Sequence, residues 1–140
     1  ITDKRMTRFN ITLRNGVDFV IQCLDKMWGG ELFVPKIPSY KILDIAKAIA
    51  PDCKYEIVGI RPGEKLHEEM ITETDTLNTV EFEKYFVILP STKLWDIDKF
   101  IKESDSSIGK ICENGFSYNS ETNKHFLNIA DLQDLIKNHI

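Results

Sequence analysis

The segment Arg61-Pro62-Gly63-Glu64 has residue types and a spacing that suit ligand binding better than any other part of the sequence. Proline presets φ at the first corner of a tight turn, and glycine accepts a positive φ at the second corner. Such a turn would hold the Arg61 guanidinium in a fixed direction. A guanidinium pairs with two phosphate oxygens at once, and the Glu64 carboxylate can accept hydrogen bonds from sugar hydroxyls. The alternative is a Pro-Gly corner whose charges are merely solvated.

A second basic element lies near the N-terminus, where Met6 and Thr7 separate Arg5 from Arg8. Two arginines at this spacing beside a hydroxyl can form an anion site, although most surface arginines bind nothing specific. A diphosphate linked to sugars would suit two arginine sites that each have hydroxyl or acid partners nearby. The residues alone predict no more than this class of ligand.

Other catalytic and cofactor-binding patterns are missing from the sequence. The seven glycines include neither a G-x-G-x-x-G nor a P-loop spacing. The sequence has three histidines and three cysteines: His67, His125, His139, Cys23, Cys53 and Cys112. They lie at no zinc-like spacing, and an odd number of cysteines favours a reducing compartment with each thiol in a plain core role. We therefore predict no metal site and no cofactor site in this chain.

The length and composition are those of one ordinary domain. The 140 residues are 42% hydrophobic and 29% charged, which argues against disorder. A net charge of −4 excludes a chain built to coat nucleic acid or an anionic membrane. No apolar stretch is long enough to span a bilayer, and the first residues lack the apolar core of a secretory signal. The first residue is not Met, so the sequence reads as a fragment of a longer cytoplasmic protein.

Hydrophobic periodicity predicts helices and short strands in alternation. Leu13–Trp28 has the period of a helix with a wide buried face, and two glycines follow it as a stop. Leu32–Val34 reads as a short buried strand. Ser39 is predicted to cap a second helix, whose apolar positions lie between Ile42 and Ile49.

Further short strands and helices follow the second helix. Ile57–Ile60 is predicted to be a strand that leads into the Arg61 turn, and Tyr85–Leu89 is the clearest buried strand. A short helix is expected around Ile97 and Ile101, and a final helix begins after Asn128 as its N-cap. The sequence thus predicts an α/β fold, a small mixed unit with helices packed on a few short strands.

Three long segments carry a family resemblance, and two shorter ones continue it. They are Met6–Thr12, Gly29–Ser39 and Gly59–Glu68, followed by Gly115–Asn119 and Thr122-Asn123. These segments resemble the C-terminal third of the UDP-N-acetylglucosamine 4,6-dehydratases, extended short-chain dehydrogenase/reductases of bacterial capsule and other surface-polysaccharide biosynthesis. The likeness covers nearly the whole chain and is weakest over the polar residues 91–114.

The resemblance implies a single substrate-binding domain over residues 1–140, with the Rossmann domain absent from this chain. In the family, an N-terminal Rossmann domain holds NADP or NAD, and the UDP-sugar binds between it and the smaller C-terminal domain. The cofactor takes hydride from C4 of the sugar, water is lost across C5 and C6, and the hydride returns to C6. The product is a 4-keto-6-deoxy UDP-sugar, and intact family members commonly form homo-oligomers.

Site residues follow from the resemblance position by position. Arg61 looks like the family's arginine on the UDP diphosphate, and Glu64 looks like the acid that meets the uridine ribose. Arg8 looks like a second diphosphate arginine, with Met6 and Thr7 lining the same wall. These assignments agree with the chemistry that the residues suggest by themselves, since each group suits the ligand atoms assigned to it.

The sequence also departs from the family pattern. The glycine-rich phosphate loop, the Tyr-x-x-x-Lys pair and the Asp-Lys acid/base pair are all absent. This chain is therefore expected to bind no cofactor and to catalyse nothing alone, and its natural partners would be a UDP-sugar and the missing Rossmann half. Asn10 stands where some inverting members have an aromatic residue, which leaves both stereochemical outcomes at C5 open.

Two other hypotheses belong to different functional classes. The chain could be a non-catalytic module that keeps the UDP-facing arginines and binds UDP-sugars as a sensor. It could also be a degenerate interaction domain, whose exposed former interdomain face drives self-association. Loss of UDP binding in Arg61→Ala would support the first, and a monomer over a wide concentration range would argue against the second.

Overall fold

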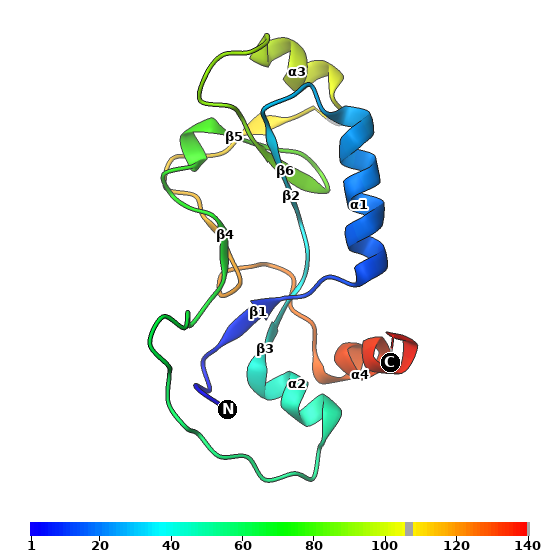
Figure 1. Ribbon diagram of the computed structural model, residues 1–140, viewed down its shortest axis with the longest axis vertical. Helices are drawn as coiled ribbons and strands as arrows, with labels where there is room; N and C mark the ends of the chain where they lie inside the picture. The colour runs from blue at the N-terminus through cyan, green and yellow to red at the C-terminus, as the bar shows by residue number, and fades with distance from the viewer. Residues whose placement is uncertain (106–107, 140) are drawn as a thin grey trace. The chain divides into compact units, whose positions relative to one another are not determined.

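A computed structural model describes residues 1–105 and 108–139 of the chain (Figure 1). Contacts divide the chain into two compact units. Unit 1 comprises Ile1–Thr12, Ile37–Glu69 and Asn119–Ile140, and unit 2 comprises Leu13–Lys36 and Met70–Tyr118. The prediction of one domain over residues 1–140 stays a prediction, since this division concerns contacts and not independent folding. The mixed α/β class is confirmed.

Unit 2 is built on a four-stranded sheet with the strand order β2-β6-β5-β7. The strands are β2 (Leu32–Pro35), β5 (Thr79–Glu81), β6 (Tyr85–Ile88) and β7 (Lys110–Ile111). Each neighbouring pair is antiparallel, and β6 lies between β2 and β5. The strand predicted over Tyr85–Leu89 is confirmed, because a short apolar run with ladder partners on both sides is the pattern of a central strand.

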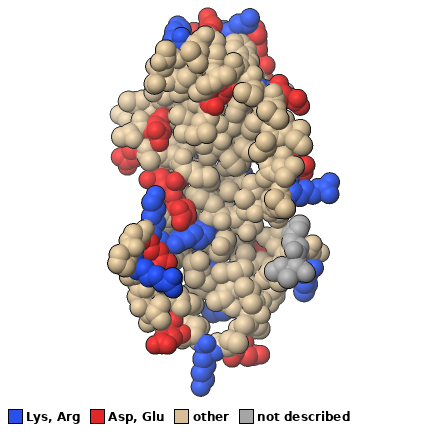
Figure 2. Space-filling model, in the orientation of Figure 1, with Lys and Arg blue, Asp and Glu red and all other residues tan. Residues whose placement is uncertain are grey.

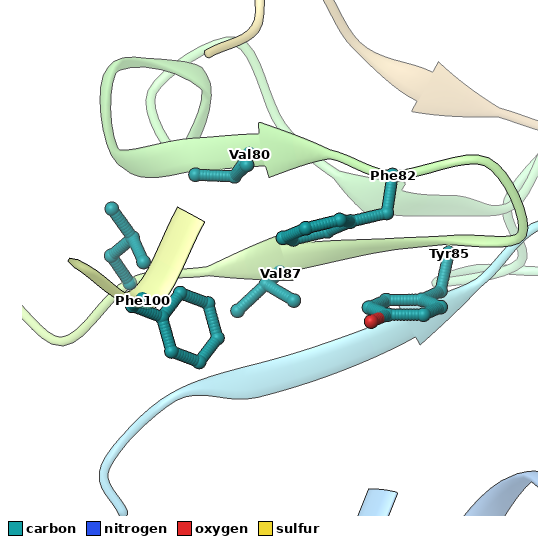
Figure 3. Packing of buried hydrophobic residues seen from close by; sticks show 6 residues of the cluster. Val80, Phe82, Tyr85, Val87 and Phe100 are labelled. Carbon is teal, nitrogen blue, oxygen red and sulfur yellow. The ribbon is translucent and has the colours of Figure 1, made fainter. Parts of the chain in front are cut away.

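The core of unit 2 lies on one side of this sheet and is largely aromatic (Figure 3). Its buried members are Val80, Phe82, Tyr85, Val87, Leu89 and Phe100. The rings of Phe82 and Tyr85 are stacked with centroids 5.1 Å apart. Phe100 comes from helix α3 (Ile97–Glu103) and is fully buried. Burial of large rings supplies most of the apolar area that holds this unit together.

Helix α1 (Leu13–Lys26) runs alongside β2 and β6 within unit 2 (Figure 1). The helix itself is confirmed, and Gly29 and Gly30 follow it with positive φ. The wide buried face predicted for it is wrong. Phe19 packs against the core cluster, whereas five apolar side chains of the predicted face are at least half exposed: Leu13, Val17, Val20, Ile21 and Leu24. A helix can pack through a single row of side chains along one face, and in α1 the row that contacts the core is narrow.

The segment 91–114 contains one confirmed helix and lies in unit 2, with Ser106 and Ser107 outside the described residues. Asp96 is the N-cap of α3, and its side chain accepts a hydrogen bond of 2.9 Å from the Lys99 N–H. A carboxylate at this position satisfies one of the free N–H groups of the first turn and favours the helix dipole.

Cys112 follows β7, and burial raises the pKa of its thiol to about 11, with the Glu81 carboxylate adding to the effect. We expect Cys112 to react with iodoacetamide far more slowly than the exposed Cys53, because the thiolate is the nucleophile. The shift of about two pH units corresponds to on the order of 100-fold less thiolate near pH 8. Mass spectrometry of partially alkylated chain should find Cys53 modified first, and modification of Cys112 should keep accelerating toward pH 11. Equal rates at pH 8 would contradict this expectation.

Unit 1 contains a two-stranded antiparallel sheet and two helices. Strand β1 (Thr7–Phe9) pairs with β3 (Ser39–Lys41), with Arg8 opposite Tyr40. Helices α2 (Ile42–Ile49) and α4 (Ile129–His139) contact each other. The predicted N-cap of the last helix is confirmed, since the Asn128 Oδ1 accepts hydrogen bonds from the N–H groups of the first turn.

Two further predictions for unit 1 are wrong. Ser39 caps no helix, because it is fully buried in β3 and its Oγ accepts a hydrogen bond of 2.9 Å from the Asn123 amide. Helix α2 begins three residues later without a side-chain cap. Ile57–Ile60 forms no strand, and Gly59 within it has a positive φ of 87°. The Val58 N–H bonds to the Ile1 carbonyl, and a single terminal residue offers too few partners for a ladder.

Three shorter elements complete the fold. They are β4 (Glu69–Ile71), the 3₁₀ turn η1 (Thr76–Asn78) and β8 (Tyr118–Asn119). Strands β4 and β8 pair in a second two-stranded sheet. No helix in the described part of the chain combines the length and the apolar character needed to cross a bilayer.

Candidate functional site

The predicted Pro-Gly turn is present in unit 1 and is held by two hydrogen bonds. The Glu64 N–H donates to the Arg61 carbonyl at 3.0 Å, which closes the turn. Gly63 has a φ of 81°, the left-handed value that a type II turn requires at this corner. The Arg61 N–H donates to the Glu64 Oε2 at 3.1 Å, so the acid side chain also supports the turn. The local geometry predicted from Pro62 and Gly63 is therefore confirmed.

The side chains of Arg61 and Glu64 differ in the hydrogen bonds and ion pairs that they make within the chain. Arg61 is exposed, and its guanidinium has no ion pair or hydrogen bond with any residue that the structure describes. Glu64 is half-buried, and its Oε1 accepts a hydrogen bond of 3.2 Å from the Thr2 hydroxyl. The Arg61 guanidinium is thus without a partner among the described residues. The Glu64 carboxylate, by contrast, already accepts hydrogen bonds from Thr2 and from the Arg61 N–H.

Arg8 lies on β1 and is turned toward the segment that follows this turn. Its Nη1 donates to the Leu66 carbonyl at 3.1 Å, and its Nη2 donates to the Lys65 carbonyl at 2.9 Å. The Nε lies 3.4 Å from the Glu68 carboxylate. A guanidinium has five donors in a rigid fork, so it can hold several backbone carbonyls at once. In this structure the Arg8 guanidinium therefore fastens residues 65–68 to β1.

Met6 and Thr7 are buried, with side-chain contacts inside unit 1. The Met6 Sδ lies 3.0 Å from the Thr2 Oγ1. The Thr7 hydroxyl lies 2.8 Å from the His67 Nδ1 and 2.7 Å from the Ser120 Oγ. The structure thus brings all five predicted residues into one unit, with Arg61 exposed and Met6 and Thr7 buried.

Two residues of this region, His67 and Ser120, were not predicted from the sequence to take part. The His67 Nε2 lies 3.5 Å from the Glu121 carboxylate, and the Ser120 backbone N–H donates to the Glu68 carbonyl at 2.7 Å. In the sequence His67 is one of three histidines that lie at no zinc-like spacing. The partner of its ring is Thr7, which lies 60 residues earlier, so no local pattern could have revealed the contact.

Asp3 and Arg5 form the other ion pair near the N-terminus. The Arg5 Nη2 lies 2.8 Å from the Asp3 carboxylate, and the Arg5 backbone N–H also donates to it. The side-chain and backbone hydrogen bonds from Arg5 lower the pKa of Asp3 to about 2. The Arg5 guanidinium is therefore already paired with a carboxylate, in contrast to that of Arg61.

Charges of both signs are interspersed on the face of the molecule that Figure 2 shows. A hollow of about 350 Å³ in unit 1 is lined by side chains of α4 and the segment before it: His125, Leu127, Asp131, Asp134, Leu135 and Asn138. None of the predicted site residues lines this hollow. Within residues 1–105 and 108–139, no three His, Cys, Asp or Glu side chains come together as a metal ion would need.

The described residues do not fit a nicotinamide dinucleotide. Gly29 and Gly30 have positive φ, but they follow α1 and precede β2, the reverse of the strand-to-helix order of a phosphate-binding loop. A Cβ on Gly30 would lie 2.6 Å from the Leu94 side chain, so packing accounts for this glycine. Gly29 and Gly30 are therefore not arranged as a dinucleotide-binding loop.

The chain matches known proteins along nearly all of its length. Residues 1–90 match the family described as polysaccharide biosynthesis protein. The chain is 49% identical to a UDP-N-acetylglucosamine 4,6-dehydratase (inverting) of Campylobacter jejuni subsp. jejuni serotype O:23/36, over 99% of the chain and 42% of that protein. It is 28% identical to a UDP-glucose 4-epimerase of Rickettsia massiliae, over 97% of the chain and 40% of that protein. The chain thus spans about two fifths of the length of these relatives.

A solved structure shares the fold. The X-ray structure of Pen from Bacillus thuringiensis superimposes with a TM-score of 0.76 at 26% sequence identity, covering 99% of this chain and 40% of that one. This likeness extends over both units and agrees with the mixed α/β class predicted from the sequence.

Proposed function

Since the chain belongs to the polysaccharide biosynthesis protein family, we propose that it is the substrate-binding portion of a UDP-N-acetylglucosamine 4,6-dehydratase. Its task would be to bind the UDP moiety of UDP-N-acetylglucosamine for the synthesis of bacterial surface polysaccharide or glycan. The observation that carries the proposal is the exposed Arg61 guanidinium, which has no partner among the described residues and projects from a braced turn beside Glu64.

The chemistry of the turn supports this assignment. A diphosphate offers oxygens that a guanidinium can bind in pairs, and a turn closed by two hydrogen bonds reduces the entropy lost on binding. The Glu64 carboxylate, one residue beyond the glycine, would accept hydrogen bonds from the ribose hydroxyls. Its existing bonds to Thr2 and to the Arg61 N–H orient it for this role.

Arg8, Met6 and Thr7 are proposed to form the same wall of the site. Arg8 binds the backbone of residues 65 and 66 in the free chain, so a diphosphate would have to share or displace these hydrogen bonds. Met6 and Thr7 are buried, and they would support the wall from behind.

The rest of the reaction would come from elsewhere in the enzyme. NADP or NAD, the Tyr-x-x-x-Lys pair and the Asp-Lys pair would be supplied by a Rossmann half, with which this chain would act in the cytoplasm as part of a homo-oligomer. When bound there, the cofactor would supply hydride removal at C4 of the sugar. The residues of this chain would hold the nucleotide and orient the sugar toward that half.

A chimera tests the proposal. The matching two fifths of the Campylobacter jejuni dehydratase would be replaced by this chain, and the product formed from UDP-N-acetylglucosamine would be followed by mass spectrometry. We expect a product lighter by one water that carries a 4-keto group. A chimera that folds and binds NADP and UDP-N-acetylglucosamine, yet releases no dehydrated product, would overturn the proposal, with the unaltered Campylobacter jejuni enzyme as the positive control.

A further inference from the structure

A chain of hydroxyl and imidazole groups crosses the interior of unit 1, and we call it the hydroxyl relay. It consists of the Ser120 hydroxyl, the Thr7 hydroxyl and the His67 ring, which come from three segments far apart in the sequence. The Ser120 Oγ lies 2.7 Å from the Thr7 Oγ1, which lies 2.8 Å from the His67 Nδ1. Ser120 is fully buried and Thr7 is 4% exposed, so water has almost no access to these two hydroxyls.

The direction of the relay is set at its buried end. The Glu68 backbone N–H donates to the Ser120 Oγ at 2.9 Å, and a backbone N–H cannot act as an acceptor. The hydrogen of the Ser120 hydroxyl then has one acceptor among the described residues, the Thr7 Oγ1. The hydrogen of the Thr7 hydroxyl is then left with one acceptor among the described side chains, the His67 Nδ1 at 2.8 Å. All donors are satisfied only if Nδ1 carries no hydrogen.

We propose that the hydroxyl relay holds His67 as the neutral tautomer with its hydrogen on Nε2, and that His67 is a positioning residue for the Arg61–Glu64 turn. A second proton on the ring would place a hydrogen on Nδ1. Either the Thr7 hydroxyl or the Ser120 hydroxyl would then be a buried donor without an acceptor among the described residues. Buried donors are costly to leave unpaired, so protonation of His67 would break the relay.

Several carboxylates lie around His67, and one of them is close to the Nε2 atom of its ring. The Glu121 carboxylate lies 3.5 Å from Nε2 and can accept its hydrogen in either protonation state. Asp3 is close enough for the charge of a protonated His67 to lower its pKa, and it is paired with Arg5. Glu68 is paired with Arg8. Of these carboxylates, Glu121 therefore lies at the Nε2 end of the ring, while Asp3 and Glu68 are each paired with an arginine.

The link between His67 and the ligand turn is the backbone of residues 65–68. The Leu66 carbonyl accepts hydrogen bonds from the Thr7 N–H and from the Arg8 guanidinium. The relay therefore fastens the same stretch of backbone that Arg8 holds, immediately after Glu64. When the relay breaks, this stretch loses one of its attachments to β1, and the turn before it is less well ordered for a diphosphate. This consequence rests on the proposed function.

The tautomer is tested directly by long-range ¹H–¹⁵N NMR of the full chain near neutral pH. We expect the His67 Nδ1 resonance to be that of an unprotonated nitrogen and Nε2 that of a protonated one. The exposed His125 is the internal control and should show averaged tautomers. In Thr7→Val the His67 resonances should shift toward those of His125, and Thr7→Ser, which keeps the hydroxyl, should restore them. A hydrogen on Nδ1, or averaging in the unaltered chain, would overturn the proposal whether or not the variants fold.

The consequence for binding is tested with UDP-N-acetylglucosamine, because its diphosphate has no proton that titrates near neutral pH. Its affinity would be measured at two pH values at which NMR shows His67 singly and doubly protonated. We expect at least threefold weaker binding in the doubly protonated state, and no such difference in Thr7→Val. Equal affinities in the two states would overturn the positioning role. Failure of the nucleotide to bind at any pH would instead refute the proposed function, while the tautomer measurement still decides the relay.

Discussion

Arg61→Ala should weaken the binding of UDP-N-acetylglucosamine to the isolated chain by about 10- to 100-fold. The estimate assumes the loss of charge-assisted hydrogen bonds, which contribute roughly 1.5–3 kcal/mol. Half of a binding site is expected to bind in the range of about 0.1 to a few millimolar, because the opposite wall is missing. Backbone amide shifts in an NMR titration would give the affinity, and in the unaltered chain they should cluster on residues 61–68. In the variant they should nearly vanish.

The matched control for Arg61→Ala is Arg14→Ala in unit 2. Arg14 is also exposed, and its only ion pair within the described residues is with Asp18 four residues later, so the net charge changes equally. We expect no measurable change in affinity for this control. Arg61→Lys should be intermediate, since an ammonium cannot bind two phosphate oxygens as a planar fork does. The stability of Arg61→Ala should stay within about 0.5 kcal/mol of the original, as for exposed residues in general. Equal weakening by both alanine variants would indicate bulk charge and not a site.

Phe100→Ala should destabilise unit 2 by about 3–5 kcal/mol, because it removes a fully buried ring and leaves a cavity. The ring is stacked on Trp95 with centroids 4.6 Å apart, and it meets Trp28 edge-on at 5.5 Å. Both tryptophans of the chain therefore report on this position. Urea unfolding followed by tryptophan fluorescence should show a large fall in the midpoint, and the emission of the folded variant should also change.

Leu94→Ala is the control for Phe100→Ala, since Leu94 precedes α3 but is 60% exposed. We expect it to change the free energy of unfolding by less than about 1 kcal/mol. Phe100→Leu should lie between the two variants, because it keeps apolar volume but loses the aromatic contacts. If Phe100→Ala unfolds within 1 kcal/mol of the unaltered chain, the aromatic cluster does not hold unit 2 together.

The Arg61 and Phe100 variants lie in different units, so one is expected to affect nucleotide binding and the other stability. Arg61 lies in unit 1, and its substitution is expected to change binding without changing stability, whereas Phe100 lies in unit 2, and its substitution is expected to change stability. A variant of Phe100 that remains folded should still bind the nucleotide through Arg61 and Glu64.

Features that depend on a few neighbouring residues could be predicted from the sequence. Pro62 and Gly63 determine the turn because one restricts φ and the other accepts a positive φ, whatever surrounds them. Asn128 caps the last helix for an equally local reason, since its side chain reaches N–H groups two and three residues ahead. The apolar run of β6 identifies a central strand. The family resemblance also rests on contiguous segments, and the match over residues 1–90 confirms it.

The tertiary structure decided which side chains bind each other and which remain free. Arg5 and Arg8 look alike in the sequence, but β1 brings only Arg8 to the backbone of residues 65 and 66. Ser39 has the residue type of a helix cap, yet pairing with β1 places it in a strand. Hydrogen bonds between distant segments depend on strand pairing and burial, which only the folded chain brings about. The sequence by itself therefore determined the Pro-Gly turn, and the fold decided that the Arg61 guanidinium has no partner among the described residues and that Thr7, His67 and Ser120 meet.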